Sequence, residues 1–359
     1  MPGVEGGTPY RAADLERFAK ELFERVGVEP GDAALTAASL VEANLRGVDT
    51  HGVTRVLTQY VRRIHRGVTS AQTNVTVVRE SPSTALIDGQ NSIGQVVAER
   101  AMRLAVQKAQ QTGAAWVGTA HSNHFGAAAY YAMMAAEQNL VGIVMTNGMH
   151  SVAPTGGRKP MLGTNPIAFA LPAGEEPPVV IDMATSVVAR GRIMLYYKQG
   201  LPMPEGWALD AQGRPTTSAA DALDGTLLPV GAYKGYALAL VIDMLAGVMT
   251  GALFGSHFHG GLADDMVHPM DVGHLFGALD PARFMPLPVF KARMDQAIRE
   301  LRSCPPAEGA KGVLIPGDIE RKEHQRRLRE GIPLPDAVVE EFRQLSSEFG
   351  VSMPEPMLP

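Results

Sequence analysis

Hydrophobic residues recur at helical spacing near both ends of the chain. The segments with this spacing are 11–26, 30–46, 50–64, 289–302 and 335–349. Pro30 suits the first turn of its segment, and the hydroxyl of Thr50 suits an N-cap. His51 and Arg55 are four residues apart, so we expect them on one face of the third helix. Both ends of the chain are therefore predicted to be helical.

The middle of the chain has a different pattern, with short apolar runs bounded by Gly, Pro and Asn. Candidate strands are 84–88, 115–118, 141–145, 167–170, 179–181 and 274–279, and candidate helices between them are 92–111, 127–139 and 237–253. This alternation predicts a mixed α/β (α+β) layer structure. We expect two domains: residues 1–74 with 288–359 form a discontinuous helical domain, and residues 75–287 form a central sheet domain.

One apolar run, Tyr236 to Phe254, is about long enough to cross a bilayer. Asp243 stands near its centre, and Gly247 and Gly251 weaken it as a membrane helix. We interpret it as a buried helix, at a subunit interface where the glycines permit close approach.

Composition narrows the functional classes. The chain has 359 residues, of which 45% are hydrophobic, so it can bury a large core. A net charge of -5 argues against nucleic acid as the main partner, and the basic cluster 321–327 is interpreted as a solvated helix face. Cys304 is the only cysteine, and residues 1–10 lack the apolar core of a signal peptide. We expect a cytoplasmic protein.

His124 is the most informative single residue. It lies in Ser122-Asn123-His124-Phe125-Gly126, between the apolar run 114–119 and the helix-forming run 127–137. A histidine at a strand-to-helix junction faces the amide groups and positive dipole of a helix N-terminus, which favours the neutral ring near pH 7. A neutral imidazole can accept a proton. A satisfied loop histidine is the more common outcome, so position alone does not establish catalysis.

Several loops could hold a nucleotide, although the G-x-G of a Rossmann fold is absent. Three Gly-rich loops, at residues 145–148, 154–157 and 163–166, contain small residues that let a backbone approach phosphates. Asp182 follows a predicted strand, where ligand sites gather in α/β sheets, and Lys234 precedes the long apolar run. Turns, an N-cap aspartate and a solvated lysine are the structural alternatives.

A metal site is considered because two histidines two residues apart lie near further acidic and histidine side chains. These residues are His257, His259, Asp264, Asp265 and His268. No third ligand has a recognised spacing, so we expect no metal.

Six ordered motifs together resemble the malate/L-lactate dehydrogenase family, which includes ureidoglycolate and sulfolactate dehydrogenases and cyclic imino-acid reductases. The motifs are Asp49-Thr50-His51-Gly52-x-x-Arg55, Ser122-Asn123-His124-Phe125-Gly126, Gly163-Thr164-Asn165-Pro166, Asp182-Met183-Ala184-Thr185-Ser186, Lys234-Gly235-Tyr236 and Pro316-Gly317-Asp318. The similarity runs in order from about residue 11 to 335. It implies the non-Rossmann fold of the sulfolactate dehydrogenases, a homodimer, and NAD or NADP as cofactor.

The resemblance also implies roles for individual residues. His124 would be the general acid/base, and Arg55 would hold the substrate carboxylate with Thr50 and His51 beside it. The positions that match cofactor contacts are Thr146, Asn147, Gly148, Asp182, Met183, Ala184, Lys234, Gly235, Arg293, Gly317, Asp318 and Ile319.

The chain departs from the family pattern in a few places. Thr50 replaces a serine and keeps its hydroxyl, and Tyr60 comes one residue later after Arg55 than the pattern has it. Asp271 replaces an asparagine, and Met270 offers no charge where ureidoglycolate dehydrogenase has an arginine, which speaks against ureidoglycolate. Residues 256–269 match no family motif.

The leading hypothesis is therefore an NAD(P)-dependent enzyme that interconverts a small 2-hydroxy acid and a 2-oxo acid. The nearest alternative is a cyclic imino-acid reductase, in which the proton goes to nitrogen. A non-enzymatic sensor on the same scaffold would not need to retain His124 and Arg55. The sequence does not decide between NAD and NADP.

Overall fold

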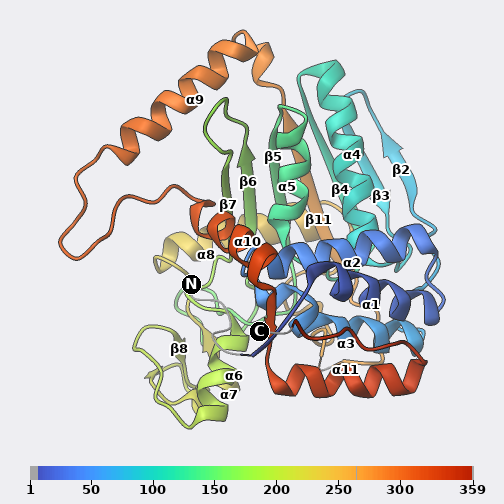
Figure 1. Ribbon diagram of the computed structural model, residues 1–359. Coiled ribbons are helices and arrows are strands. Elements are labelled where there is room, and N and C mark those ends of the chain that lie inside the picture. Colours follow the sequence, from blue (N-terminus) through green and yellow to red (C-terminus); the bar gives the residue numbers. More distant parts are fainter. Residues whose placement is uncertain (1–6, 264, 358–359) are drawn as a thin grey trace.

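A seven-stranded mixed sheet forms the centre of the computed structural model, which describes residues 7–263 and 265–357 (Figure 1). Its order is β2-β3-β4-β11-β5-β6-β7, and β3 and β4 are parallel whereas the other neighbours are antiparallel. The strands are β2 (Thr76–Glu80), β3 (Thr84–Asp88), β4 (Ala114–Ser122), β5 (Val141–Thr146), β6 (Ile167–Leu171), β7 (Val179–Met183) and β11 (Val272–Leu279). The predicted mixed α/β class is confirmed.

Two helices cover one face of this sheet, α4 (Gly94–Thr112) and α5 (Ala128–Glu137). Small residues let α5 approach closely. A Cβ at Gly142 of β5 would lie 2.2 Å from the carbonyl oxygen of Ala132. A buried core of alanines and valines, with Phe125 and Phe276, fills the space between these helices and the sheet.

The N-terminal helices pack against the C-terminal one around a second core. They are α1 (Ala12–Arg25), α2 (Pro30–Leu45), α3 (Val53–His65) and α11 (Asp336–Phe349), joined by the two-stranded sheet of β1 (Thr8–Tyr10) and β12 (Ile332–Leu334). The apolar positions of α3 recur at helical spacing and are buried. Its first residue is Val53 and its N-cap is Gly52, so the expected cap at Thr50 is wrong.

Helix α10 (Asp318–Glu330) packs on α2, and its Arg327 is fully buried. Both terminal nitrogens of Arg327 contact the carboxylate of Asp49, Nη2 at 2.9 Å, and Glu323 accepts from its Nε. The interpretation of residues 321–327 as a wholly solvated face is therefore wrong. The buried pair fixes η1 (Asp49–His51), the turn that carries Thr50 and His51.

The apolar run after residue 232 forms α8 (Tyr233–Asp243) and continues as a π-helical turn, η2 (Met244–Val248), which packs on the second face of the sheet. One of its faces is exposed within this chain, so its burial at a subunit interface stays a prediction. The exposed apolar residues are Leu238, Val241, Met244, Val248 and Met249. Within the described residues, no helix combines the length and apolarity needed to cross a membrane.

Two further parts stand apart from the sheet (Figure 1). A small layer with its own core contains α6 (Arg190–Gln199), α7 (Ala219–Asp224), β8 (Ala208–Leu209), β9 (Pro215–Thr216) and β10 (Thr226–Leu227). The helix α9 (Leu287–Arg302) projects from the side of β6 and β7. Asp295 and Arg299 of α9 make polar contacts with the turn between those strands.

Candidate active site

The loop that carries His124 joins β4, which ends at Ser122, to α5, which begins at Ala128, as the sequence predicts. Neighbouring loops hold it firmly. The side-chain NH₂ group of Asn123 donates to the carbonyl oxygen of Ser92 at 2.9 Å. Gly94 packs closely on the loop, because a Cβ at this position would lie 2.4 Å from the carbonyl oxygen of His124. The His124 ring is therefore presented from a rigid base.

Tyr60 of α3 holds one edge of that ring. Its hydroxyl oxygen lies 2.5 Å from Nδ1 of His124 and 3.2 Å from the carbonyl oxygen of the same residue. The side-chain amide of Gln95, from the start of α4, donates to the Tyr60 hydroxyl at 3.1 Å. No described residue makes a hydrogen bond to Nε2 of His124, so this nitrogen is the one open to a ligand.

His51 lies against the face of the His124 ring. The two centroids are 5.5 Å apart with an angle of 15° between the planes. Nδ1 of His51 lies 2.9 Å from the hydroxyl oxygen of Thr50. The structure thus brings three of the predicted site residues, Thr50, His51 and His124, into one cluster.

The imidazoles of this cluster are neutral near pH 7. Burial lowers the pKa of His124 to about 3, with smaller contributions from the nearby rings of His51 and His274. Burial also lowers the pKa of His51 to about 4. We expected the start of α5 to keep His124 neutral, whereas burial is the largest cause. A buried imidazole disfavours its charged form because the protein solvates an ion less well than water.

Arg55 does not share a helical face with His51, because His51 precedes α3 and belongs to η1. That expectation is wrong. Arg55 and Tyr60 are five residues apart in α3, which places their side chains about 140° apart around the helix axis. Arg55 is exposed, and across residues 7–263 and 265–357 its guanidinium has no hydrogen bond or ion pair.

Two of the predicted cofactor segments meet beyond the end of β7, and a third lies beside the first residues of that strand. A Cβ at Gly235 of α8 would lie 3.0 Å from the carbonyl oxygen of Thr185, so the start of α8 lies directly on the segment after Asp182, Met183 and Ala184. Gly317 precedes α10 with φ +98°, and a Cβ there would lie 3.2 Å from that of Val180. The exposed residues of this group are Asp182, Met183, Lys234 and Ile319.

The chemistry of this junction fits a dinucleotide. Helix α8 begins after the end of β7 and α10 begins beside Val180 of the same strand, and their first amide groups can donate to phosphate oxygens. Ala232, just before α8, has φ 54° and ψ -124°, a conformation that costs energy for any residue with a Cβ. Asp182 also has a local role, because its carboxylate accepts from the backbone N–H of Ala129 in the first turn of α5 at 2.8 Å.

Two other predicted cofactor positions have internal partners. Thr146 is buried, and its hydroxyl oxygen lies 2.7 Å from Nδ1 of His274. Asn147 donates to the carbonyl oxygen of Leu253 at 2.7 Å and accepts from the N–H of Gly273. Both side chains therefore stabilise the fold, whereas a Cβ at Gly148 would meet open space.

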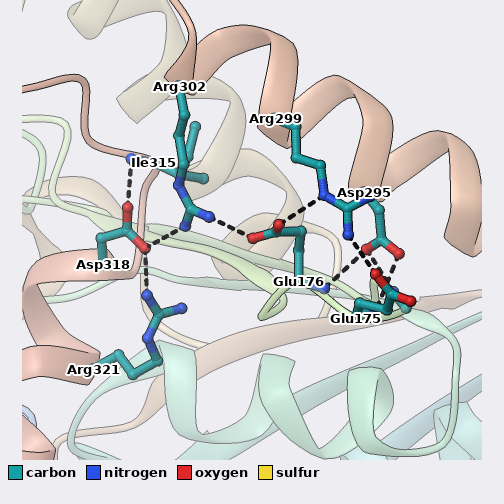
Figure 2. Close-up of polar contacts among 9 residues, drawn as sticks. Glu175, Glu176, Asp295, Arg299, Arg302, Ile315, Asp318 and Arg321 are labelled. Carbon is teal, nitrogen blue, oxygen red and sulfur yellow. Dashed lines mark hydrogen bonds and ion pairs between the residues drawn. The ribbon is translucent and has the colours of Figure 1, made fainter.

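Asp318 also has internal partners, which Figure 2 shows. One carboxylate oxygen accepts from Arg302 at 3.0 Å and from Arg321 at 2.8 Å, and the other accepts from the N–H of Ile315. Arg293 is exposed on α9, nine residues before Arg302 and so about 13 Å from it along the axis. The structure does not bring Arg293 to the other predicted cofactor residues.

The histidines near residue 260 do not gather around a common point. Among the described residues, no group of three His, Cys, Asp or Glu side chains could hold a metal ion, and Asp264 lies outside those residues. The rings of His259 and His268 stack with centroids 4.3 Å apart, and Asp265 accepts from Nδ1 of His268.

Sequence patterns missed three residues that surround His124. Tyr60 was identified only as a departure from a family motif, and its buried helical position was the signal that could have found it. Gln95 begins α4 without any recognisable motif. His274 was assigned to an apolar strand, but its Nε2 lies 2.9 Å from the hydroxyl oxygen of Ser122, and its ring stacks on Phe125 at 4.5 Å.

Comparison with known proteins adds to this geometry. The family model described as malate/L-lactate dehydrogenase matches residues 10–343. The malate/(S)-sulfolactate dehydrogenase of Methanothermus fervidus is 40% identical over 333 residues, which cover 93% of this chain and 96% of that protein.

Solved structures agree with the fold. The sulfolactate dehydrogenase of Methanocaldococcus jannaschii superimposes with a TM-score of 0.90 at 36% identity, covering 96% of this chain and 98% of that one. The Δ1-piperideine-2-carboxylate reductase of Pseudomonas syringae gives a TM-score of 0.84 at 29% identity, covering 94% and 99%. The expected sulfolactate-dehydrogenase-like fold is confirmed.

Proposed function

The chain belongs to the malate/L-lactate dehydrogenase family of oxidoreductases, and we propose that it interconverts a small 2-hydroxy acid and the matching 2-oxo acid, with NAD or NADP as cofactor. The observation that carries this proposal is the neutral imidazole of His124. Its Nδ1 edge faces Tyr60, and its Nε2 is open to a substrate oxygen.

His124 is the proposed general acid/base. On oxidation of the alcohol its ring takes the hydroxyl proton, and on reduction it returns a proton to the oxygen. A low pKa suits the first task, because the ring is already neutral near pH 7 and has a lone pair to offer. The hydrogen bonds of Asn123 fix the loop, and the contact with Tyr60 fixes the ring of His124. The ring therefore loses less entropy on reaching the reactive geometry.

Arg55, Thr50 and His51 are the proposed binding residues for the substrate carboxylate. A guanidinium without an ion pair can bind a carboxylate through two parallel hydrogen bonds. The Thr50 hydroxyl and the His51 ring lie on the His124 side of the site. In this arrangement the carboxylate is held at one end of the substrate while His124 faces the oxygen on the carbon that changes oxidation state.

The proposed cofactor site is the junction of β7, α8 and α10. When bound, a nicotinamide cofactor accepts or donates the hydride. The exposed ammonium of Lys234 and the first turns of α8 and α10 would face its phosphates. The residues proposed to contact it are Thr146, Asn147, Gly148, Asp182, Met183, Ala184, Lys234, Gly235, Gly317, Asp318 and Ile319, with Arg293 proposed on the resemblance alone.

We further propose that the enzyme works as a cytoplasmic homodimer on small carboxylates, without nucleic acid or membrane partners. The exposed apolar face of α8 and η2 supports association, because soluble proteins seldom leave several such residues together in water. The negative net charge gives no electrostatic attraction to phosphodiester backbones.

A cyclic imino-acid reductase is the second candidate. The structural likeness to Δ1-piperideine-2-carboxylate reductase supports it. In this reaction His124 would face a ring nitrogen instead of an oxygen, while the carboxylate would be held in the same way.

A substrate panel tests the proposal and separates the two candidates. Pyruvate, oxaloacetate, a sulfonated 2-oxo acid and a cyclic imino acid are each mixed with NADH or NADPH, and the fall in absorbance is followed. Oxidation of the cofactor with a 2-oxo acid supports the leading function, and oxidation with the imino acid alone supports the second. If no compound is reduced, both fail.

The role of His124 is tested in the same assay. His124→Ala should lower turnover by about 10²–10⁴-fold while cofactor binding is retained. His65→Ala is the matched control, because His65 is an exposed histidine of α3 whose ring contacts Phe349. Unchanged turnover in His124→Ala would exclude His124 as the general acid/base.

A further inference from the structure

The single hydroxyl proton of Tyr60 has two acceptors within reach, both on His124. They are Nδ1 at 2.5 Å and the carbonyl oxygen at 3.2 Å. If the proton points to Nδ1, the neutral ring must carry its own proton on Nε2. If it points to the carbonyl oxygen, the ring carries its proton on Nδ1 and donates it to Tyr60. The hydroxyl of Tyr60 therefore determines what His124 presents to a substrate.

The surroundings of Nδ1 favour the first arrangement. The backbone N–H of Gly126 also points at Nδ1 of His124, at 3.4 Å. Two donors that converge on one nitrogen require a lone pair there. A proton on Nδ1 would instead face the N–H of Gly126.

Gln95 reinforces this choice through the orientation of its amide. Its Nε2 donates to the Tyr60 hydroxyl, so the Tyr60 oxygen acts as an acceptor on that side. With the amide reversed, Oε1 would face Tyr60 and attract the hydroxyl proton away from His124. The orientation of one buried amide thus decides the tautomer of the ring two steps away.

A small cavity lined by His124 and Gln95 explains the orientation of the Gln95 amide. Its lining includes Tyr60, Arg63, Gln95 and His124, and it has room for about one water molecule. Arg63 is 1% exposed, and its two terminal nitrogens donate to the carbonyl oxygens of Asp265 and His268. Its Nε and the Oε1 of Gln95 are both buried without a partner among the described residues.

We propose that one water molecule in this cavity bridges Nε of Arg63 and Oε1 of Gln95, and that Tyr60 is thereby the positioning residue that keeps His124 in its Nε2–H tautomer. The water accepts from the Arg63 N–H and donates to the Gln95 carbonyl. Because the Arg63 N–H can only donate, the water keeps its protons to donate. An amide with its oxygen toward this cavity accepts one of them, whereas a reversed amide would add a second donor and remove this acceptor, so the first orientation satisfies more groups.

This arrangement deepens the proposed function and rests on it for its chemical meaning. In the direction of reduction, a neutral Nε2–H offers a hydrogen bond to the oxo oxygen of a 2-oxo acid before hydride transfer. A neutral imidazole with a lowered pKa can polarise a carbonyl in this way, as the histidine of triosephosphate isomerase does. Oxidation of the alcohol needs a lone pair on Nε2, and there the Tyr60 proton turns to the carbonyl oxygen of His124 while the ring carries its own proton on Nδ1. The tautomer itself can be measured without any turnover.

The test uses ¹⁵N-histidine-labelled protein and the nitrogen chemical shifts of the His124 ring, assigned by comparison with His124→Ala. We expect Nε2–H in the unmodified enzyme, a mixture of tautomers in Tyr60→Phe, and Nδ1–H in Gln95→Glu, whose carboxylate attracts the Tyr60 proton. Tyr131→Phe is the matched control, because Tyr131 is a buried tyrosine that donates to Phe125 and not to His124. Far-ultraviolet circular dichroism checks that each variant is folded.

Two results of the tautomer measurement would overturn the proposal. One is Nδ1–H in the unmodified enzyme. The other is an Nε2–H tautomer that persists in both Tyr60→Phe and Gln95→Glu. A crystal structure that shows water between Arg63 and Gln95 supports the bridge, whereas one with the Gln95 oxygen on Tyr60 contradicts it.

Kinetics separate this proposal from the proposed function. In Tyr60→Phe we expect kcat to fall at least about tenfold while KM changes little, because the ring stays in place with its proton on the wrong nitrogen for part of the time. If the unmodified enzyme reduces no 2-oxo or imino acid, the proposed function fails, but the tautomer measurement still stands or falls separately.

Discussion

Two ion-pair networks tie the C-terminal helices to the rest of the protein, and they differ in their access to water. In the first, Arg327 of α10 is 0% exposed and pairs with Asp49, which is 9% exposed. In the second, Arg299 of α9 is 53% exposed and pairs with Glu175, which is 83% exposed (Figure 2). The hydrogen bonds are of similar length, 2.9 Å from Arg327 Nη2 and 2.6 Å from Arg299 Nη2.

The two networks show that hydrogen-bond geometry alone does not determine how much an ion pair contributes to the free energy of unfolding. Exposed pairs gain little, because water already solvates both charges and salt screens them. A buried charge that loses its partner has no such alternative. The buried pair also holds η1, which carries Thr50 and His51 beside His124, so it connects stability to the site.

Breaking the buried pair should have the largest effect. Arg327→Met leaves the Asp49 carboxylate buried without the positive charge of the arginine, although Asn44 still donates to it, and we expect the free energy of unfolding in urea to fall by about 3–5 kcal/mol. Turnover should fall as well, because η1 loses its support.

The double variant Asp49→Leu/Arg327→Met sharpens this test. Replacing both charges by apolar groups should recover most of the stability, since neither charge is then stranded. If turnover stays low in the double variant, the pair acts mainly by positioning η1. A loss of less than about 1 kcal/mol in Arg327→Met would remove the distinction between the two networks.

The pH dependence of stability should show an intermediate effect. Hydrogen bonds from Arg326 and Arg327, with the charge of these arginines, lower the pKa of Glu323 from 4.5 to about 2. A lowered pKa stabilises the folded state above pH 4.5, and the stabilisation is lost as the pH falls toward 2. The urea midpoint of the unmodified protein should thus exceed that of Glu323→Gln at pH 7, and this gap should close between pH 4.5 and 2. A gap that stays constant over that range would contradict the assignment.

Breaking the exposed network should have the smallest effect. Arg299→Gln removes the pairs with Glu175 and Glu176 but leaves Arg302 bound to Glu176 and Asp318. We expect the melting temperature to change by no more than the error of the measurement, with turnover unchanged. A large decrease at low salt that disappears at high salt would show that the exposed network stabilises the fold after all.

Local patterns predicted the part of the site that depends on neighbours in sequence. The apolar run before Ser122 and the helix formers after Gly126 placed His124 correctly between β4 and α5. The apolar spacing of α3 was also confirmed. These features follow from periodicity, which is a property of a short segment.

The rest depends on partners far away in the chain. Arg327 looks like a solvated residue because its own helix is polar, and its partner Asp49 is 278 residues earlier. Tyr60 reaches His124 across 64 residues. The run at α8 was predicted to be buried from its apolarity, yet its outward face remains exposed in this chain. Composition indicates that such a face avoids water but does not identify what covers it.

The hydrogen bond from the N–H of Ala129 to the carboxylate of Asp182 has a consequence for engineering. Asp182 stands at the end of β7 and is one of the proposed cofactor contacts, so substitutions intended to change cofactor preference would include it. The same carboxylate caps the helix that follows the His124 loop. Mutations at Asp182 would therefore be pleiotropic, and a screen that scores only cofactor choice would confuse altered recognition with a loosened α5.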